Sequence, residues 1–174
     1  MTYINSLNQS SDLNNIDCLL GHSSEEIMRF LIPLSQDYPE IFEWFHTKVI
    51  PGALCGTRKL ILKQRNNEIV ALGIAKKEDA ENKICTVRVA HEYVGKGLGV
   101  RVFDELLEWL NVSKPLLTVS EYKYPQFKKL FEHYGFVLTS INDGMYLPGK
   151  KEFIFNEHTP LNHVRSLNSG NFLE

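Results

Sequence analysis

Three glycines lie within the segment Val94-Gly95-Lys96-Gly97-Leu98-Gly99-Val100. Glycine lets the main chain approach a ligand closely, and the free N–H groups at a helix N-terminus attract anions. Lys96 and Arg101 occupy positions where carboxylates are usual at the start of a helix, and no acidic residue follows before Asp104. This placement of charge predicts a phosphate site, and the alternative is an ordinary Gly-rich turn whose charges face solvent.

The elements on either side of the glycines must position them. Residues 84–89 are largely β-branched and alternate in polarity, so they predict a strand. Apolar residues then recur at helical spacing from 102 to 110, with acidic residues on the opposite face. The glycines are therefore expected at a strand-to-helix junction, where main-chain N–H groups and the helix dipole converge.

Two better-known phosphate-binding loops do not fit this segment. A P-loop requires Ser or Thr after its Gly-Lys pair, whereas Gly97 follows Lys96. The dinucleotide-binding fingerprint places its last two glycines three residues apart, whereas Gly97 and Gly99 are separated by two positions. Neither class of nucleotide-binding loop is predicted.

The spacing Val94-x-x-Gly97-x-Gly99 instead resembles the pyrophosphate-binding signature Arg/Gln-x-x-Gly-x-Gly/Ala of the GCN5-related N-acetyltransferase (GNAT) superfamily. Tyr134-Gly135-Phe136 follows at the separation usual in that superfamily, and the resemblance covers about residues 60–141. It implies an enzyme that transfers acetyl from acetyl-CoA to a primary amine of a small molecule, protein or peptide. The acetyl-CoA is a co-substrate, and no metal is implied.

The resemblance also implies where acetyl-CoA binds. It would lie between the central strand and the following short strand, which diverge in this family. The main chain of Val87 and Val89 would meet the thioester and the pantetheine arm. The pyrophosphate would be held by the amides of Val94, Gly95, Lys96, Gly97, Leu98, Gly99 and Val100.

Three positions depart from the family pattern. Val94 replaces the usual Arg or Gln, Phe131 replaces the Tyr that often protonates the sulfur, and Tyr124 replaces an Asn. The acid and base must therefore be sought among nearby residues, each of which could also be a surface carboxylate or a packed aromatic. The candidate bases are Glu121, Glu92 and His91, and the candidate acids are Tyr134, Tyr124 and Tyr122, of which Glu121, Tyr134 and Tyr124 are the leading choices.

Composition limits the possible classes of protein. The 174 residues carry a net charge of −2 and include 43% hydrophobic residues, which suits one soluble domain over 1–174 without a strongly basic nucleic-acid surface. No apolar run approaches the length of a membrane span, and the N-terminus lacks the pattern of a signal peptide. Three scattered cysteines favour reduced thiols and a cytoplasmic location.

The chain as a whole predicts an α/β (α+β) fold, a GNAT-like mixed and mostly antiparallel sheet of about six to seven strands with helices on both faces. A loose leader is expected over 1–15 and a tail or arm over 157–174. A Ser-capped helix should begin near Ser23 and stop near Pro33, and a second helix with Pro39 in its first turn should end at Pro51-Gly52. Strands are expected at 59–64, 69–75, 84–89, 115–119, 136–141 and 152–155, with helices at about 98–110 and 122–134.

Two other functions stay open at this level. One is a non-catalytic GNAT module that binds acyl-CoA as a sensor or partner, which Phe131 favours. The other is a GNAT that modifies tRNA or another nucleic acid, which the acidic balance disfavours. The aromatic-rich residues 38–45 suggest an acceptor with flat or apolar character, although such residues more often form core. A sheet edge or the tail could pair two copies into a homodimer.

Overall fold

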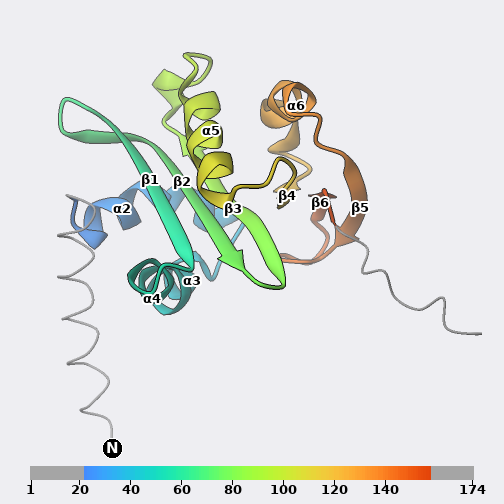
Figure 1. Cartoon of the computed structure of the whole chain (residues 1–174), viewed down its shortest axis with the longest axis horizontal. Helices are drawn as coiled ribbons and strands as arrows, with labels where there is room; N and C mark the ends of the chain where they lie inside the picture. Colours follow the sequence, from blue (N-terminus) through green and yellow to red (C-terminus); the bar gives the residue numbers. More distant parts are fainter. Residues whose placement is uncertain (1–21, 158–174) are drawn as a thin grey trace, which may run out of the picture.

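The computed structural model describes residues 22–157, which form six strands and several helical segments (Figure 1). The strands are β1 (Arg58–Arg65), β2 (Glu68–Glu78), β3 (Glu81–Val89), β4 (Leu116–Ser120), β5 (Leu138–Asp143) and β6 (Lys151–Phe155). The helical segments are α2 (Ser24–Leu31), η1 (Ile32–Gln36), α3 (Ile41–Trp44), η2 (Phe45–Val49), α4 (Ile50–Leu54), η3 (His91–Tyr93), α5 (Leu98–Leu110) and α6 (Tyr124–His133).

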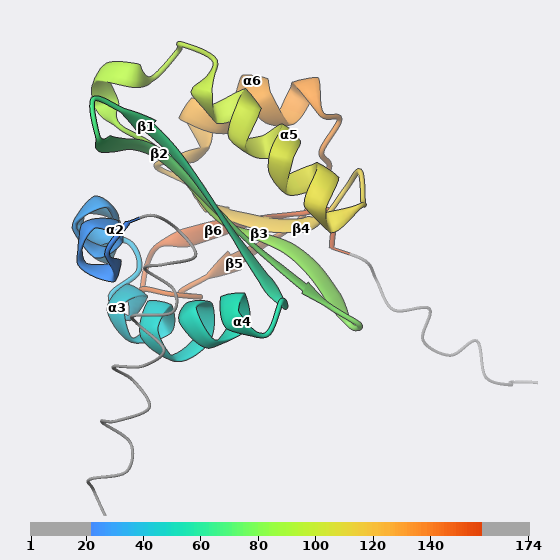
Figure 2. The ribbon, with the colours of Figure 1, turned by 60° about the vertical axis from the view of Figure 1, so that its left-hand side comes forward.

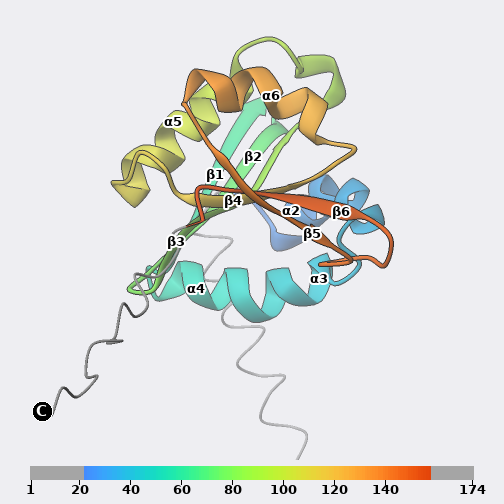
Figure 3. The same ribbon diagram turned by 90° about the vertical axis from the view of Figure 1, so that its right-hand side faces the viewer.

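The strands form one mixed sheet in the order β1-β2-β3-β4-β6-β5. β3 and β4 run parallel, and every other neighbouring pair is antiparallel. Figures 2 and 3 show α5 and α6 over one face of this sheet and α2, α3 and α4 over the other. The expected mixed, mostly antiparallel sheet with helices on both faces is confirmed. The expected leader, and all of the expected tail except Glu157, lie outside the described residues.

Two apolar cores lie on the two faces of the sheet. On one face α5 and α6 bury a cluster that includes Phe103, Leu106 and Phe131. On the other face α2 and the α3–α4 helix bury a second cluster around Phe45 and Leu72. Because each face has its own helices, β2 is buried over most of its length.

The N-terminal helices follow the sequence pattern with two corrections, both in the second helix. Ser23 and Glu26 cap α2 reciprocally, as the Ser-capped start predicts. The second helix begins at Ile41 with Glu40 as its N-cap, so Pro39 precedes the helix and the prediction that it lies in the first turn is wrong. The helix passes through Pro51 to Leu54, so the predicted end at Pro51-Gly52 is wrong as well. The reason is a wider π turn over Phe45–Val49 that places Pro51 in the first turn of α4, where no N–H donor is needed.

α5 is pressed unusually close to β2. A Cβ built on Gly73 of β2 would lie 2.4 Å from Val102 Cγ1 and 3.0 Å from Leu106 Cδ1. Glycine therefore allows this close approach, which sets the height of α5 above the sheet. Across residues 22–157, no helix has the length and apolar character needed to cross a bilayer.

Candidate functional site

β3 and β4 separate soon after they meet. Their parallel pairing involves only Lys83 with Leu116 and Ile84 with Leu117. At the same level the β2–β3 register shifts, because Ile74 pairs with Thr86 while Ala75 pairs with Ile84. This bulge of one extra residue in β3 bends the strand, and a gap opens between the carboxyl ends of β3 and β4.

The main chain of Val87 and Val89 faces this gap. Ala90 N–H donates to Val70 O at 2.8 Å, so alternate residues of β3 point their N–H and C=O groups towards β2. Val87 and Val89 have the opposite orientation, and β4 has no residue paired with either of them. Their main-chain groups are therefore available to a ligand, at the place where the resemblance implies the thioester and the pantetheine arm.

The glycine loop presents a set of free amides at the start of α5. Gly95 and Gly97 adopt φ of 78° and 80°, which other residues adopt only with strain. Within the described residues, Val94 N–H donates to His91 O and Lys96 N–H to Tyr93 O. Five amides between positions 95 and 100 have no acceptor in that part of the chain, those of Gly95, Gly97, Leu98, Gly99 and Val100.

The charges around these amides are positive. The first turn of α5 contains no acidic residue. Arg101 is exposed and makes no ion pair with any described residue, and Lys96 Nζ lies over the ring of Tyr93 at 5.2 Å from its centroid. The loop thus combines free N–H donors, the positive end of a 13-residue helix and two cations, which suits a phosphate group.

Solved structures with the same architecture are acetyltransferases. An aminoglycoside 6'-N-acetyltransferase complexed with coenzyme A matches with a TM-score of 0.53 and 10% identity over 75% of this chain and 87% of that one. The acetyltransferase of GNAT family from Streptococcus pneumoniae matches with a TM-score of 0.52 and 15% identity over 63% and 71%. Nourseothricin acetyltransferase matches with a TM-score of 0.51 and 14% identity over 57% and 64%.

The chain has the GNAT fold. No protein-family model and no curated protein sequence matches it, so the similarity is one of structure. The expected resemblance to the GNAT superfamily is confirmed at the level of the fold. Identities of this size leave the acceptor and the catalytic groups to be argued from the chain's own residues.

Tyr134, a candidate acid, is tied to α5 in this GNAT fold. Its hydroxyl donates to Asp104 Oδ1 at 2.7 Å and lies 3.3 Å from Val100 O, and its ring stacks on Phe103. Burial, together with the hydrogen bond to Asp104, raises the pKa of Tyr134 above its ordinary value. The hydroxyl proton is held in a hydrogen bond to a carboxylate of the neighbouring helix. Tyr134 is therefore better suited to joining α5 to α6 than to donating a proton to the leaving thiolate.

Tyr124 begins α6, after a short turn that follows the carboxyl end of β4. Its ring packs within an aromatic cluster that includes Phe131, Phe153 and Phe155. Its hydroxyl makes no hydrogen bond with any other described residue. Phe131, at the family's Tyr position, is 3% exposed and lies among the rings of this core. Of the two leading tyrosines, Tyr124 therefore has the free hydroxyl and lies at the open end of β4.

Glu121 lies between β4 and α6 and turns towards β6. Its N–H donates to Lys151 O, and its Oε1 accepts from Lys151 N–H at 3.4 Å. Its second carboxylate oxygen has no partner in the described chain. The remaining candidates flank the site: His91 and Glu92 lie in η3 before the loop, and Tyr122 is 65% exposed.

A buried carboxylate that sequence reasoning missed lies beside this site. Glu152 of β6 is 4% exposed and pairs in register with Ser120, the last residue of β4. Its Oε1 accepts a hydrogen bond from the Tyr38 hydroxyl at 3.1 Å. Burial raises the pKa of Glu152, and hydrogen bonds from Thr118 and Tyr38 oppose that rise. The available signal in the sequence was that Glu152 and the apolar Ile154 are two residues apart in one strand. Such residues lie on the same face of the sheet, so a buried Ile154 indicates a buried Glu152.

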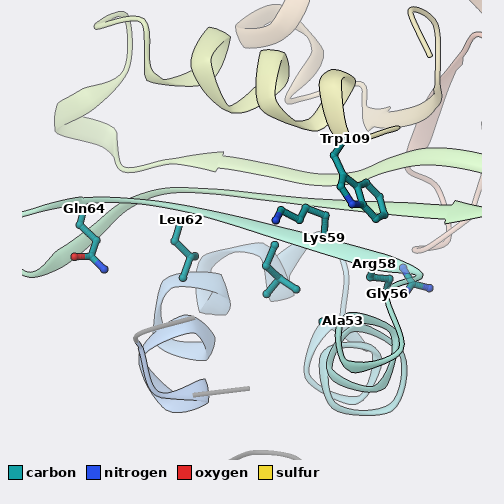
Figure 4. A pocket seen from close by; sticks show the side chains of 8 residues that line it. Ala53, Gly56, Arg58, Lys59, Leu62, Gln64 and Trp109 are labelled. Atoms are coloured by element: carbon teal, nitrogen blue, oxygen red, sulfur yellow. The ribbon is translucent and has the colours of Figure 1, made fainter. Parts of the chain in front are cut away.

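A separate groove of about 450 Å³ follows the outer edge of β1, as Figure 4 shows. Trp109 projects into it from the C-terminal end of α5, and Arg58 and Lys59 line it from β1. None of the predicted site residues lines this groove, which lies at the opposite end of α5 from the glycine loop. Within residues 22–157, no three His, Cys, Asp or Glu side chains are arranged to hold a metal ion.

Proposed function

We propose that the protein is an N-acetyltransferase that transfers acetyl from acetyl-CoA to a primary amine of a small molecule, protein or peptide. The observation that carries the proposal is the set of five free amides at the start of α5, next to the gap between β3 and β4. A coenzyme A complex of an acetyltransferase with the same fold supports it.

The glycine loop would bind the pyrophosphate of acetyl-CoA through main-chain donors. The amides of Val94 and Lys96 are used within the loop, so we assign the pyrophosphate to the other five. Val94 is exposed and cannot donate from its side chain, unlike the Arg or Gln of the family signature. Lys96 and Arg101 would supply positive charge instead, which favours the bound anion.

The reaction requires three groups from the chain: donors that stabilise the oxyanion, an acid that protonates the leaving thiolate, and a base that accepts the proton of the amine. The amine nitrogen attacks the thioester carbon, a C–N bond forms, the C–S bond breaks, and the amine loses a proton to a base. We assign oxyanion stabilisation to the main-chain N–H groups of Val87 and Val89, and protonation of the leaving thiolate to the Tyr124 hydroxyl. Glu121, through its free carboxylate oxygen, is the candidate base.

Calorimetric titration of acetyl-CoA tests the proposal. A Gly97→Glu variant places bulk and negative charge in the amide cradle and should lose binding at least tenfold. Gly56→Glu is the matched control, because Gly56 has φ of 82° against 80° for Gly97 and a Cβ on either glycine meets nothing within 4 Å. Equal loss in both variants, or no binding to the wild type, would overturn the assignment.

A non-catalytic acyl-CoA-binding module is the second candidate. It is favoured by Phe131 in the aromatic core and by the Tyr134 proton that is committed to Asp104. The two functions differ in turnover, because only an enzyme releases coenzyme A thiol faster when an amine is added. Release that no amine, peptide or tRNA accelerates, in a protein that binds acetyl-CoA, would favour the module.

We also propose a cytoplasmic location. Cys55 and Cys85 are free thiols, and burial raises the pKa of Cys85, which keeps it in the unreactive thiol form. Free thiols are typical of reducing compartments. Fractionation of the cells that express the protein would test this directly.

A further inference from the structure

Two carboxylates lie close to the loops that join η1 to α3 and β5 to β6, Asp37 within the first loop and Glu152 in β6, but only Asp37 is neutralised. Asp37 pairs with Lys150 at 3.2 Å and lies 3.9 Å from Lys123 Nζ. Glu152 has no cationic nitrogen of a described residue within 4 Å, and Lys83 acts on it only at longer range. Figure 3 shows the β5–β6 loop beside the start of α3.

The surroundings of Glu152 contain a second unsatisfied group. Ser120 is directly opposite Glu152 in the β4–β6 register, so the two side chains lie next to one another on the same face. Ser120 is 2% exposed, and its Oγ has no hydrogen-bond partner in the described chain. Few buried hydroxyls in folded proteins are left unpaired, so an orphan beside a buried carboxylate points to a ligand.

Two tyrosine rings cover the same place. The Tyr38 hydroxyl donates to Glu152 Oε1, and the Tyr38 ring meets the Tyr146 ring edge-on at 4.9 Å between centroids. Tyr38 precedes α3, and Tyr146 lies in the β5–β6 loop, so the contact joins the two loops. Aromatic faces attract cations as well as apolar groups.

A buried carboxylate is costly unless a cation and hydrogen-bond donors accompany it. We propose that Glu152 binds the positively charged ammonium group of the acceptor, with Ser120 Oγ as a second acceptor oxygen and the edge-to-face rings of Tyr38 and Tyr146 as the aromatic side of the site. The inference rests on the proposed acetyl transfer only in treating the bound amine as the acceptor.

This arrangement defines a class of substrate. An ammonium group donates to Glu152 and Ser120, whereas an alcohol brings no charge and a carboxylate is repelled by Glu152. The tyrosine rings favour an aromatic or apolar body next to the nitrogen. The site lies where β4 ends, on the face of the sheet opposite α5 and α6. The acceptor would thus approach the gap from the side away from those helices.

Ligand-observed NMR with benzylamine, a cation at neutral pH, tests the inference, and benzyl alcohol of nearly equal shape is the uncharged comparison. We expect the wild type to bind benzylamine in preference to benzyl alcohol. Glu152→Gln keeps the size of the side chain and removes its charge, and should weaken benzylamine binding roughly tenfold to a hundredfold. Glu68→Gln, at an exposed position at the start of β2, removes the same charge elsewhere and should leave binding unchanged.

A second variant keeps the inference testable if Glu152→Gln does not fold. Ser120→Ala removes the unpaired hydroxyl and keeps the carboxylate, and should weaken benzylamine binding severalfold without loss of the fold. Benzylamine binding that is absent from the wild type, equal to that of benzyl alcohol, or equal in wild type and Glu152→Gln would overturn the inference. Titration of acetyl-CoA into the same samples keeps the two proposals separate, because the proposed function fails if acetyl-CoA does not bind, whatever benzylamine does.

Discussion

At the scale of single residues, the site is defined by which polar groups already have partners. Tyr134 and Tyr124 were equal candidates from sequence, yet one hydroxyl is hydrogen-bonded to Asp104 and the other is free. Glu152 was overlooked, although it is the buried carboxylate nearest to the end of β4. Whether a polar side chain already has a hydrogen-bond partner indicates its reactivity better than its residue type does. A proton that is held in a hydrogen bond to a carboxylate must first be released before it can be transferred.

The proposed proton donor can be tested by removing one oxygen. Tyr124→Phe keeps the ring in the aromatic cluster and should lower kcat for acetyl transfer by about 10²-fold, the lower end of general acid–base contributions. The affinity for acetyl-CoA should not change, since the phenol acts on the leaving thiolate. Turnover is measured as thiol release with any primary amine that the wild type accepts. An unchanged kcat would remove Tyr124 from the mechanism.

Tyr134→Phe should act on stability instead. The variant loses the hydrogen bond from the hydroxyl to Asp104 while its ring still stacks on Phe103. We expect a loss of about 1 kcal/mol in the free energy of unfolding, measured by urea denaturation. An unchanged free energy of unfolding would show that the hydrogen bond from Tyr134 to Asp104 does not stabilise the contact between α5 and α6.

Glu152 should make stability depend on pH in a defined direction. Burial raises its pKa in the folded protein above the unfolded value, so the folded state holds this proton more tightly. Its contribution is complete at low pH and is lost as pH rises through the folded-state pKa. The unfolding free energy of Glu152→Gln minus that of wild type should therefore increase as pH rises above the ordinary range of carboxyl titration. A difference that stays flat as pH rises would contradict a raised pKa of Glu152.

At the scale of elements, the close packing of α5 on β2 holds the glycine loop in place. The β3 bulge and the two-pair contact between β3 and β4 open the gap, and η3 and the glycine loop connect the end of β3 to the start of α5. Gly73 permits this packing because no side chain separates the helix from the strand. The height of the helix thus determines where the five free amides stand relative to the gap.

Gly73→Ala tests this dependence. The new methyl group would meet Val102, a stiff and fully buried side chain, so the helix must move or the strand must bend. We expect a loss of about 1–3 kcal/mol in the free energy of unfolding and weaker binding of acetyl-CoA. Gly99→Ala is the control for the fold, since a Cβ there meets only Val89 Cγ2 at 3.9 Å. Equal stabilities of Gly73→Ala and wild type would contradict this account.

At the scale of the whole molecule, the sheet consists of two halves with few direct links. β1, β2 and β3 form one half and β4, β6 and β5 the other, and only two residue pairs join the halves within the sheet. A ligand that contacts both sides of the gap would connect them. Binding to the folded state alone raises stability with the logarithm of the ligand concentration relative to Kd.

Acetyl-CoA should therefore stabilise the fold and protect the gap. At a concentration one hundred times its Kd, about 2.7 kcal/mol of stabilisation is expected, which corresponds to a rise of roughly 5–10 °C in Tm. Hydrogen exchange should slow most in residues 86–89 and 95–100. A Tm rise without protection in these two segments would place the ligand elsewhere, for example in the groove along β1.

The sequence by itself determined the local parts of the site. Glycine spacing, the strand before it and the amphipathic helix after it predicted the amide loop, because turn chemistry and periodicity act over a few residues. Asn66-Asn67, between β1 and β2, is a local turn signal of the same kind, and both residues adopt positive φ. The resemblance to the GNAT superfamily implied a mixed, mostly antiparallel sheet with helices on both faces, and the structure confirmed that fold.

Only the tertiary structure decided which side chains are buried together and which are free. The hydrogen bond from Tyr38 to Glu152 spans 114 positions in the chain, and no local pattern encodes it. The passage of the second helix through Pro51 depended on a π turn that propensities do not reveal. The contrast between the committed hydroxyl of Tyr134 and the free hydroxyl of Tyr124 likewise arises from packing. Burial and pairing of distant residues are properties of the folded chain as a whole, and they determine which groups can react.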